Sequence, residues 1–478
     1  MASHALNRHL ALAGFMGAGK STFGSQVARR LGRPFVDLDR EIEAREEMSV
    51  AELFERDGEP GFRAIEQRVA AEVLDRGEPA VIALGGGAVL SDDTRELLGR
   101  RAFTVLLDVD LGTAWERASR TARPLARDRE AFMALYQARE PVYAEVADAR
   151  ARDIDGIVLA AAGIEVRIGA IDLLGELIPG NGAIEIVADS TVAGIHGVTV
   201  QLALGSRDVA LHEIPAGEAA KAVGVLDHLW RSLRLGRDGT IVALGGGCTT
   251  DLAGFAAATW MRGISWAAVP TSLVGQVDAA IGGKAAIDLP GAKNIVGAFH
   301  WPERVVIDPG TLETLPETEM QNGMAEVVKT GLLLGSPVWE LPVAEMVRRC
   351  AAFKGGICLG DPHDRGPRNQ LNLGHTFAHA LEAAAGYDLP HGQAVALGMV
   401  AALRLSGNDD ALATVREQLE PQPIRVDRDA AWAALARDKK AIGGAPRLVL
   451  LEETGNATWG NEVAAAEIRA ALDSLISD

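Results

Sequence analysis

Short apolar runs alternate with amphipathic stretches through residues 1–310. The strand-like runs include FVDLD, FTVLLDVD, VTVQLAL and WAAVPTSL, and segments with helical periodicity separate them. Alternation of this kind predicts an α/β fold with largely parallel sheets. After about residue 316 the strand-like runs become rare, and residues 316–415 are rich in Ala and Leu, as in helices. We therefore expect α/β parts followed by a mainly helical part.

The first glycine-rich loop lies in LALAGFMGAGKST, residues 10–22, between an apolar run and a helical pattern. It fits G-x-x-x-x-G-K-[ST] with Gly14, Gly19, Lys20 and Ser21. In such a loop backbone N–H groups surround phosphate, the lysine reaches the outer phosphates, and the hydroxyl ligates Mg²⁺. The loop predicts a nucleotide phosphate site.

A second glycine-rich segment, TIVALGGGCTTDLAGFAAATWMRG, spans residues 240–263. A glycine turn between a strand and a helix suits a dinucleotide pyrophosphate, but three glycines also make a plain tight turn. VIALGGGAV at 81–89 has nearly the same pattern. The segment alone leaves both interpretations open.

Three of the ten histidines lie in NLGHTFAHALEAAAGYDLPHG, residues 372–392. His375 and His379 are four residues apart and would share one helix face. Since imidazole is the commonest metal ligand, this pair favours a metal site. Two partly buried, hydrogen-bonded histidines remain the alternative.

Composition narrows the class of protein. A chain of 478 residues is too long for one ordinary hydrophobic core and suggests two to four domains. Its content of 48% hydrophobic and 23% charged residues is ordinary for a soluble globular protein. The net charge of −18 argues against nucleic acid as the main partner, although it leaves phosphorylated small molecules open. The three cysteines form no CxxC pair, and no apolar run approaches membrane-spanning length. We expect a soluble cytoplasmic protein without a membrane partner.

Motifs beyond the first loop give the first third of the chain a specific resemblance. They are FVDLDREIE (35–43), GEPGFRAIE (58–66), ALGGGAV (83–89), ARPLA (122–126) and QAREPVYAEVA (137–147). In this order and spacing, residues 7–150 resemble the shikimate kinases. The resemblance implies a P-loop kinase domain, residues 1–161, with a parallel sheet and flanking helices. It would transfer phosphate from ATP with Mg²⁺ to shikimate, giving shikimate 3-phosphate.

The same resemblance implies particular site residues. Asp39, Lys20 and Arg123 would be catalytic, with Asp39 orienting or deprotonating the attacking hydroxyl. Residues expected at ATP and Mg²⁺ are Gly17, Ala18, Gly19, Lys20, Ser21, Thr22, Asp37 and Arg123. Residues expected at shikimate are Asp39, Arg63, Gly85, Gly86, Gly87 and Arg139. The two arginines would grip the carboxylate. The family ends in a further helix, whereas here RDIDGIVLAAAGIEVRIG is expected to lead directly into the next domain.

From about Ile164 to its end the chain resembles the 3-dehydroquinate synthases. The motifs are IEVRIGAIDLLGELI, IPAGEAAK (214–221), ALGGGCTTDLAGF (243–255), WMRG (260–263), VPTSLVGQVDAAIGGK (269–284), GAKNIVGAFH (291–300), GMAEVVKTGLL (323–333), RNQLNLGHTFAHA (368–380), LPHGQAVALGM (389–399) and ARDKKAIGG (436–444). We expect this domain at residues 162–478. Residues 162–310 would be an NAD-binding α/β part, and residues 311–478 a helical part for metal and substrate.

This resemblance implies conversion of 3-deoxy-D-arabino-heptulosonate 7-phosphate to 3-dehydroquinate and phosphate, with NAD⁺ and zinc or cobalt. The metal ligands would be Glu326, His375 and His391, so that His379 would contact substrate instead. Residues implied in catalysis are Lys329, Asp278, Lys284, His379 and Asn294. Those implied at NAD are Glu218, Lys221, Gly246, Gly247, Asp251, Thr271, Ser272, Asp278, Lys284 and Lys293. Those implied at the sugar phosphate are Arg262, Lys284, Asn294, Lys329, Lys354, Arg368, Asn372 and His379.

Further implications concern assembly and alternatives. The family forms a homodimer in which Arg262 would reach a neighbouring subunit's site. Thr250 departs from the family, which has glycine there beside the pyrophosphate turn. A related sugar-phosphate cyclase and a metal-dependent polyol dehydrogenase are alternatives for the second half. A non-catalytic nucleotide-binding scaffold is disfavoured, because both sets of reacting residues are intact.

Overall fold

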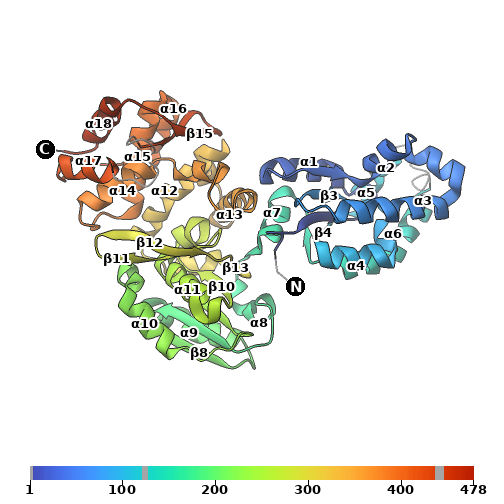
Figure 1. The fold of residues 1–478 in the computed structure, drawn as a ribbon, viewed down its shortest axis with the longest axis horizontal. Coiled ribbons are helices and arrows are strands. Elements are labelled where there is room, and N and C mark those ends of the chain that lie inside the picture. The colour runs from blue at the N-terminus through green and yellow to red at the C-terminus, as the bar shows by residue number, and fades with distance from the viewer. Residues whose placement is uncertain (1–3, 121–127, 437–445, 478) are drawn as a thin grey trace. The chain divides into compact units, whose positions relative to one another are not determined.

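The computed structural model describes residues 4–120, 128–436 and 446–477. The chain divides into two compact units, Met1–Gly163 and Ile164–Asp478 (Figure 1). Each unit is described by itself. Among the described residues no helix is both long enough and apolar enough to cross a membrane.

The first unit is built on a five-stranded parallel sheet in the order β2-β3-β1-β4-β5. Its strands are β1 (His9–Ala13), β2 (Phe35–Asp37), β3 (Val81–Ala83), β4 (Ala102–Leu107) and β5 (Ala149–Ala151). Its helices are α1 (Lys20–Leu31), α2 (Leu38–Glu46), α3 (Val50–Leu74), η1 (Ala88–Leu90), α4 (Asp92–Arg101), α5 (Leu111–Ser119), α6 (Arg129–Val146) and α7 (Ile154–Ala162). Since β1, β2 and β3 are parallel neighbours, the loops that follow them meet at one edge of the sheet.

Helix α7 corrects the expectation that the first domain lacks a terminal helix. Asp153 caps its start, and Gly163 ends it in the left-handed conformation at φ 71°. Its buried side chains include Ile157 and Val158, and Asp155 pairs with Arg30 of α1. The run DIDGIVLAAAG was misread because its apolar residues are nearly continuous and show little amphipathic spacing.

The second unit contains a six-stranded parallel sheet, in the order β6-β13-β10-β9-β7-β8. Its strands are β6 (Ile164–Val166), β7 (Ile184–Asp189), β8 (Val209–Ile214), β9 (Thr240–Gly245), β10 (Ser265–Pro270) and β13 (Arg304–Ile307). The helices of this part are η3 (Ala170–Leu173), α8 (Leu174–Leu177), α9 (Ser190–Ala203), η4 (Gly217–Lys221), α10 (Val223–Ser232), α11 (Gly247–Thr259), η5 (Trp260–Arg262), η6 (Gly275–Ala279) and η7 (Pro309–Thr314). The strands β11 (Lys284–Leu289) and β12 (Ala292–Phe299) form a separate antiparallel hairpin.

One strand-like run of the sequence is helical. VTVQLAL belongs to α9, whose start is capped by the Asp189 carboxylate. The buried residues Ala193, His196 and Val200 follow helical spacing, whereas Val198 and Leu202 are exposed. The prediction of a strand here was wrong because β-branched content outweighed periodicity.

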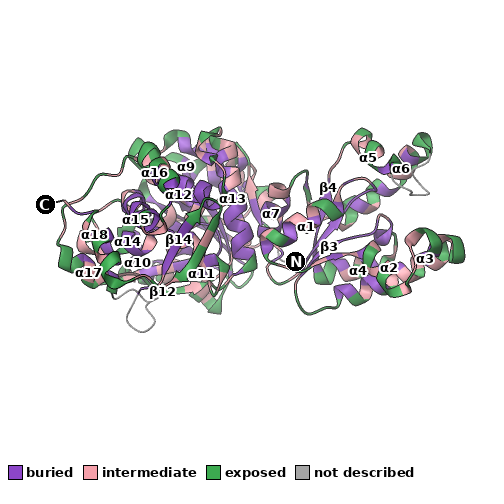
Figure 2. Cartoon of the chain, turned by 90° about the horizontal axis from the view of Figure 1, so that it is seen from above, coloured by how far each residue is buried: buried purple, intermediate pink, exposed green. Residues whose placement is uncertain are grey.

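Helices form most of the remainder, as predicted. They are α12 (Glu317–Leu334), η8 (Val338–Glu340), α13 (Val343–Gly360), η9 (Pro367–Asn372), α14 (His375–Ala384), α15 (His391–Ser406), α16 (Asp409–Leu419), α17 (Arg428–Ala436) and α18 (Ala465–Asp473). Figure 2 shows α12 and α15 largely buried within this helical core. An antiparallel hairpin, β14 (Leu448–Glu453) and β15 (Asn456–Asn461), was not predicted.

Glycines allow three helices of this core to approach closely. A Cβ at Gly398 of α15 would lie 2.0 Å from the carbonyl oxygen of Gly374, the residue before α14. A Cβ at Gly392 would lie 2.3 Å from the carbonyl oxygen of Asn322 in α12. Because real Cβ atoms do not approach backbone so closely, these contacts require glycine. They bring α12, α14 and α15 together at the starts of α14 and α15.

Candidate active sites

The first glycine loop joins β1 to α1. Gly17 has φ 84°, and a Cβ there would lie 2.2 Å from the carbonyl oxygen of Ala114, so only glycine fits. Gly19 precedes α1 without a side-chain cap, which leaves the first N–H groups of the helix for an anion. Lys20 is buried, and its Nζ donates to the carbonyls of Gly14 (2.6 Å) and Phe15 (3.2 Å). Ser21 and Thr22 are exposed in the first turn. The loop can hold phosphate.

Beside this loop, α2 and α3 bring the predicted acceptor residues next to the glycines after β3. A Cβ at Gly87 would lie 2.1 Å from Nη1 of Arg63. A Cβ at Gly85 would lie 3.0 Å from Oδ1 of Asp39 and 2.2 Å from Oε1 of Glu66. The glycines therefore make room for these side chains.

Glu66 is a site residue that the sequence did not single out. It is 2% exposed and accepts a hydrogen bond from Arg63 Nη1 at 2.5 Å. Burial raises the pKa of Glu66, although the Arg63 charge opposes that shift. The contact fixes the Arg63 guanidinium. The spacing of Arg63 and Glu66 within one helical turn was the only signal in the sequence.

Arg139 approaches the same glycines from α6. It is buried, and its Nη1 donates to the carbonyl of Gly86 at 3.2 Å. The Tyr143 hydroxyl donates to the same carbonyl at 2.5 Å, and burial raises the pKa of Tyr143 to about 12. Asp37, at the end of β2, caps α2 by accepting from the N–H of Arg40 at 3.4 Å. Arg123 lies outside the described residues.

In the second unit the glycine turn after β9 leads into α11. Gly245 has φ 156°, and α11 begins after Gly246 without a side-chain cap. A Cβ at Gly246 would lie 3.2 Å from Oγ of Ser272, and the Thr271 N–H donates to the Gly245 carbonyl. An uncapped helix N-terminus behind a glycine turn suits a pyrophosphate. The residues present fit a dinucleotide.

Thr250 does not intrude on this turn. Its Oγ1 donates back to the carbonyl of Gly247 at 2.9 Å, and the residue is 2% exposed. The side chain is thus directed into the helix, and the departure from glycine is accommodated.

A buried lysine organises the charges near this turn. The Nζ of Lys221 lies 3.0 Å from Oδ2 of Asp251 and 3.3 Å from Oε1 of Glu218, and it donates to Oδ1 of Asn294. Burial alone would lower the pKa of Lys221, but the carboxylates outweigh it and raise the pKa. Lys293 pairs with Glu218 at 3.2 Å. The structure thus joins the predicted NAD residues to Asn294, which was predicted to bind substrate.

Three ligand atoms of metal-binding type meet between α12, α14 and α15. Glu326, His375 and His391 each offer an atom, and these atoms lie within 4.8 Å of one another. Oε1 of Glu326 lies 3.5 Å from Nε2 of His375 and 3.4 Å from Nε2 of His391. This oxygen is buried, and no hydrogen-bond donor reaches it in the part of the chain that the structure describes. One carboxylate and two imidazoles suit zinc or cobalt.

Hydrogen bonds at the far side of each imidazole orient the pair. Nδ1 of His375 lies 3.2 Å from the carbonyl oxygen of Leu373, so that nitrogen is the donor and Nε2 is left for a ligand role. Nδ1 of His391 lies 3.0 Å from Oε1 of the buried Glu382. Burial lowers the pKa of His391, but Glu326 and Glu382 outweigh it and raise the pKa to about 10. Glu382, which the sequence did not single out, belongs to the site.

Two lysines and an aspartate lie beside the triad. Lys329, 1% exposed, pairs with Oε2 of Glu326 and lies 4.0 Å from Oδ1 of Asp278. Lys354 lies 2.7 Å from the same Asp278 oxygen. Burial raises the pKa of Asp278, but the two lysines outweigh it and keep the pKa below its usual value. Burial lowers the pKa of Lys354. The group can exchange protons with a molecule bound beside the triad.

Further cations surround this group. Lys284 pairs at 2.6 Å with Asp364, an acid that the sequence did not single out. Arg368 is 2% exposed, and its Nη1 donates to the carbonyl of Pro362. Asn372 donates to the carbonyl of Asn369 at 3.0 Å.

Two predicted residues lie apart from the triad. His379 is exposed, and although its ring lies 5.6 Å from that of His375, it does not belong to the group of three ligand atoms that lie within 4.8 Å of one another. Arg262 is exposed at η5 in the left-handed conformation, φ 70°. Residues 437–445, with most of the late lysine motif, lie outside the described residues.

Comparison with protein families gives three matches along the chain. The shikimate kinase model matches residues 16–156. The 3-dehydroquinate synthase N-terminal model matches residues 211–322, and the C-terminal model matches residues 323–441. The matched regions include both sites described above.

Among similar proteins is a bifunctional shikimate kinase/3-dehydroquinate synthase from Thermotoga maritima, 33% identical over 93% of this chain and 96% of its own length. A 3-dehydroquinate synthase from Methylococcus capsulatus is 39% identical over 64% of this chain and 93% of its own. Among solved structures, 2-epi-5-epi-valiolone synthase from Streptomyces hygroscopicus with NAD⁺ and Zn²⁺ bound is 27% identical. The match covers 65% of this chain and 96% of that one, with a TM-score of 0.58.

Proposed function

Since the chain belongs to the bifunctional shikimate kinase/3-dehydroquinate synthase family, we propose that the two sites described above carry out its two reactions. The first unit phosphorylates shikimate with ATP. The second converts 3-deoxy-D-arabino-heptulosonate 7-phosphate to 3-dehydroquinate and phosphate. The α/β fold class with a helical C-terminal part was predicted correctly.

In the kinase, the glycine loop and Lys20 hold the ATP phosphates, and Ser21 and Asp37 hold Mg²⁺, which neutralises phosphate charge when bound. Arg63 and Arg139 bind the shikimate carboxylate, and Asp39 orients the attacking hydroxyl. The observation that supports this assignment is the meeting of Arg63, Glu66 and Asp39 at Gly85 and Gly87. Arg123 is assigned to the phosphates from the sequence alone.

In the synthase, Glu326, His375 and His391 hold zinc or cobalt, and the turn at Gly246 and Gly247 holds the NAD⁺ pyrophosphate. When bound, these groups supply a Lewis acid and a reversible hydride acceptor. The contacts of Glu326 Oε1 with two imidazoles carry this assignment. The remaining NAD residues keep the roles proposed from the sequence.

The lysines and Asp278 act on the substrate's protons and phosphate. Lys329 and Asp278 lie beside the triad and are placed to move protons at the reacting hydroxyl and its neighbouring carbon. Lys354, Arg368 and Lys284 supply positive charge for the phosphate, which leaves as inorganic phosphate. Asn294, Asn372 and His379 complete the substrate contacts.

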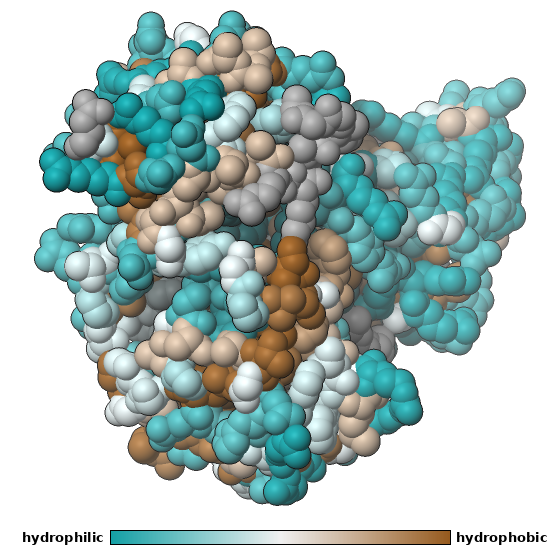
Figure 3. Space-filling view, turned by 60° about the vertical axis from the view of Figure 1, so that its left-hand side comes forward, coloured by the Kyte–Doolittle hydropathy of each residue, from teal (hydrophilic) through white to brown (hydrophobic). Residues whose placement is uncertain are grey.

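A homodimer through the second unit is the proposed assembly. Exposed apolar side chains on the hairpin β11–β12 are Leu289, Ile295, Val296 and Phe299. The hairpin lies on the side that Figure 3 turns forward, where a band of apolar surface is visible. Arg262, exposed on the left-handed turn η5, would reach the neighbouring copy's phosphate site.

The domain boundary and the cellular location are proposals as well. We place the domain boundary between residues 161 and 162, one residue before the end of α7 at Ala162. The cytoplasm is the proposed location, since Cys248, Cys350 and Cys358 are all free thiols.

An assay of the purified protein tests these functions. The heptulosonate phosphate with NAD⁺ and zinc should release phosphate without net NADH, whereas a polyol dehydrogenase would accumulate NADH absorbance. A separate assay with shikimate and MgATP should yield ADP. A related cyclase would turn over a different sugar phosphate in preference to the heptulosonate.

A further inference from the structure

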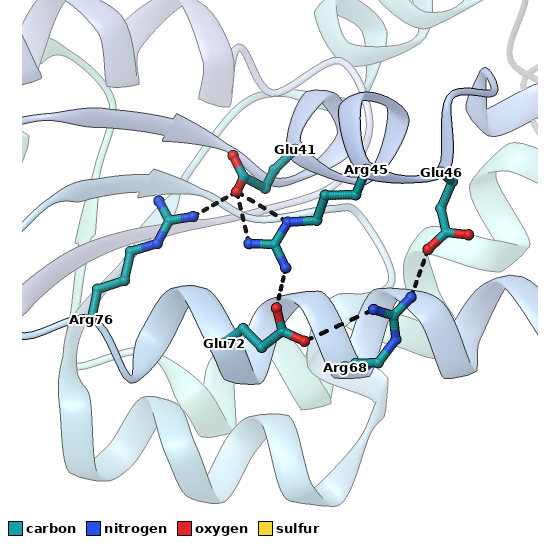
Figure 4. Close-up of polar contacts among 6 residues, drawn as sticks. All are labelled: Glu41, Arg45, Glu46, Arg68, Glu72 and Arg76. Carbon is teal, nitrogen blue, oxygen red and sulfur yellow. Dashed lines mark hydrogen bonds and ion pairs between the residues drawn. The ribbon is translucent and has the colours of Figure 1, made fainter.

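Six charged side chains on the outer face of α2, α3 and the turn after α3 form one connected network, the α2–α3 network (Figure 4). Its members are Glu41, Arg45, Glu46, Arg68, Glu72 and Arg76. It lies outside the residues assigned above to catalysis or binding.

Each inner member of the network bridges two partners. Oε1 of Glu41 accepts from Arg45 at 2.8 Å and from Arg76 at 2.5 Å. Arg45 also pairs with Glu72 across the helices, and Glu72 lies 3.8 Å from Arg68. Arg68 in turn reaches Glu46 at 2.6 Å. Such a network resists separation of the helices more than one isolated exposed pair, which contributes little.

The ionisation of Glu41 is consistent with its two arginine contacts. Burial would raise the pKa of Glu41, but hydrogen bonds from Arg45 and Arg76 outweigh it and lower the pKa. The carboxylate is therefore ionised throughout the neutral range.

The two helices that the network joins also carry the acceptor site. Asp39 lies in the first turn of α2, and Arg63 and Glu66 lie on α3. Gly58 interrupts α3 with φ 66° and ψ 179°, so the segment with Arg63 is not a continuation of the helical turns before it. The separation of Asp39 from Arg63 thus depends on the packing of α2 against the later part of α3.

We propose that the α2–α3 network is a positioning device for the acceptor site, with Arg45 and Glu72 as positioning residues. By fixing α2 against α3 it sets the distance between the group that binds the acceptor carboxylate and the group that orients its hydroxyl. It therefore governs affinity for the acceptor and leaves nucleotide affinity unchanged. This inference rests on the proposed roles of Asp39 and Arg63.

The test compares Glu72→Gln with a matched control in the full chain. Glu72→Gln keeps shape and removes charge, and it should raise KM for shikimate about fivefold through the loss of two ion pairs. KM for ATP and the rate of the synthase reaction should stay at wild-type values. The control Glu96→Gln removes the pair with Arg100, 3.0 Å apart within α4, and should change none of these constants.

Salt and a double-mutant cycle separate positioning from general stability. NaCl should raise KM for shikimate more steeply in the wild type than in Glu72→Gln, because only the wild type has the network to screen. Arg45→Met and Glu72→Gln should be strongly non-additive in KM. Arg45→Lys cannot bridge both Glu41 and Glu72, and it should raise KM for shikimate less than Glu72→Gln does. This variant replaces Glu72→Gln in the test if Glu72→Gln is insoluble.

A lower melting temperature with unchanged KM for shikimate, or a parallel rise in both KM values, would overturn the proposal. Wild-type protein that does not phosphorylate shikimate would instead refute the assigned kinase function.

Discussion

Oε1 of Glu326 and Nε2 of His375 lie 3.5 Å apart, although they belong to helices α12 and α14. His391 of α15 completes the group at 3.4 Å from the same oxygen. Three separate helices thus supply one carboxylate and two imidazoles, and the neighbour that local spacing favoured, His379, stays outside.

The first prediction concerns this triad. His375→Ala and His391→Ala should each lose bound zinc and synthase activity, because either change leaves only two protein ligands. His379→Ala should lower activity and keep about one metal per chain, by elemental analysis of the purified variants. Metal lost from the His379 variant and retained in the His391 variant would restore the i, i+4 pair.

A second prediction concerns Glu382, whose carboxylate orients His391. Glu382→Gln should weaken zinc binding about tenfold, because partners of ligand imidazoles tune ligand orientation and basicity. Competition with a zinc chelator measures the effect. Glu345→Gln, an acid on α13 that lies 3.9 Å from Arg348, is the control. Equal affinity in both variants would remove Glu382 from the metal site.

The third prediction separates the two activities. Lys20→Ala should lower the kinase rate at least about 100-fold, since it removes the charge aimed at the transferred phosphate. The synthase rate should stay within about twofold of wild type, because Lys20 belongs to the other compact unit. Both rates are measured on one preparation. A parallel loss in folded protein would contradict the separation of sites.

Gly87→Ala offers a test of the acceptor site. Gly87 has φ −118°, which alanine adopts without strain, but its Cβ would lie 2.1 Å from Arg63 Nη1. The flexible guanidinium should move away, and KM for shikimate should rise roughly 10- to 100-fold with the loss of a charge-assisted contact. Gly99→Ala, where nothing lies within 4 Å, is the control. An unchanged KM would argue against Arg63 as a carboxylate ligand.

The fifth prediction tests the domain boundary. A fragment of residues 164–478 should retain synthase activity, and a fragment of residues 1–163 should fold. Removal of α7 from the latter should lower its free energy of unfolding by more than about 3 kcal/mol, because Ile157 and Val158 are buried. Urea unfolding of fragments 1–163 and 1–152 measures the difference. Equal stabilities would show that α7 contributes nothing to the first unit.

Much of the fold could be predicted from the sequence because the apolar periodicity is local. β1, β9 and the helices after them follow from single windows of the sequence. The prediction of a strand at VTVQLAL was wrong because these β-branched residues lie in a helix whose apolar face is partly exposed. Only tertiary packing determines that such a segment is helical. The β14–β15 hairpin was not predicted, although Leu448–Leu451 are buried in the helical core, because a run of four apolar residues is too short to distinguish a strand from a helix.

The sites divide in the same way. The glycine loops follow from motif spacing, whereas Glu326 joins His375 only through the crossing of two helices. Glu66, Glu382 and Asp364 resemble ordinary surface acids in the sequence. Their roles depend on burial, or on one cationic side chain that is far away in the sequence. No pattern along the chain predicts either of these.

The glycines at the helix crossings have a consequence for evolution and engineering. Gly374, Gly392 and Gly398 ligate nothing, yet a side chain at any of them would strike the backbone of a neighbouring helix. In a saturation-mutagenesis survey these positions should be as intolerant as the ligands themselves. Transplanting the carboxylate and imidazoles into another helical scaffold would then fail unless the three gaps in side-chain volume were transplanted with them.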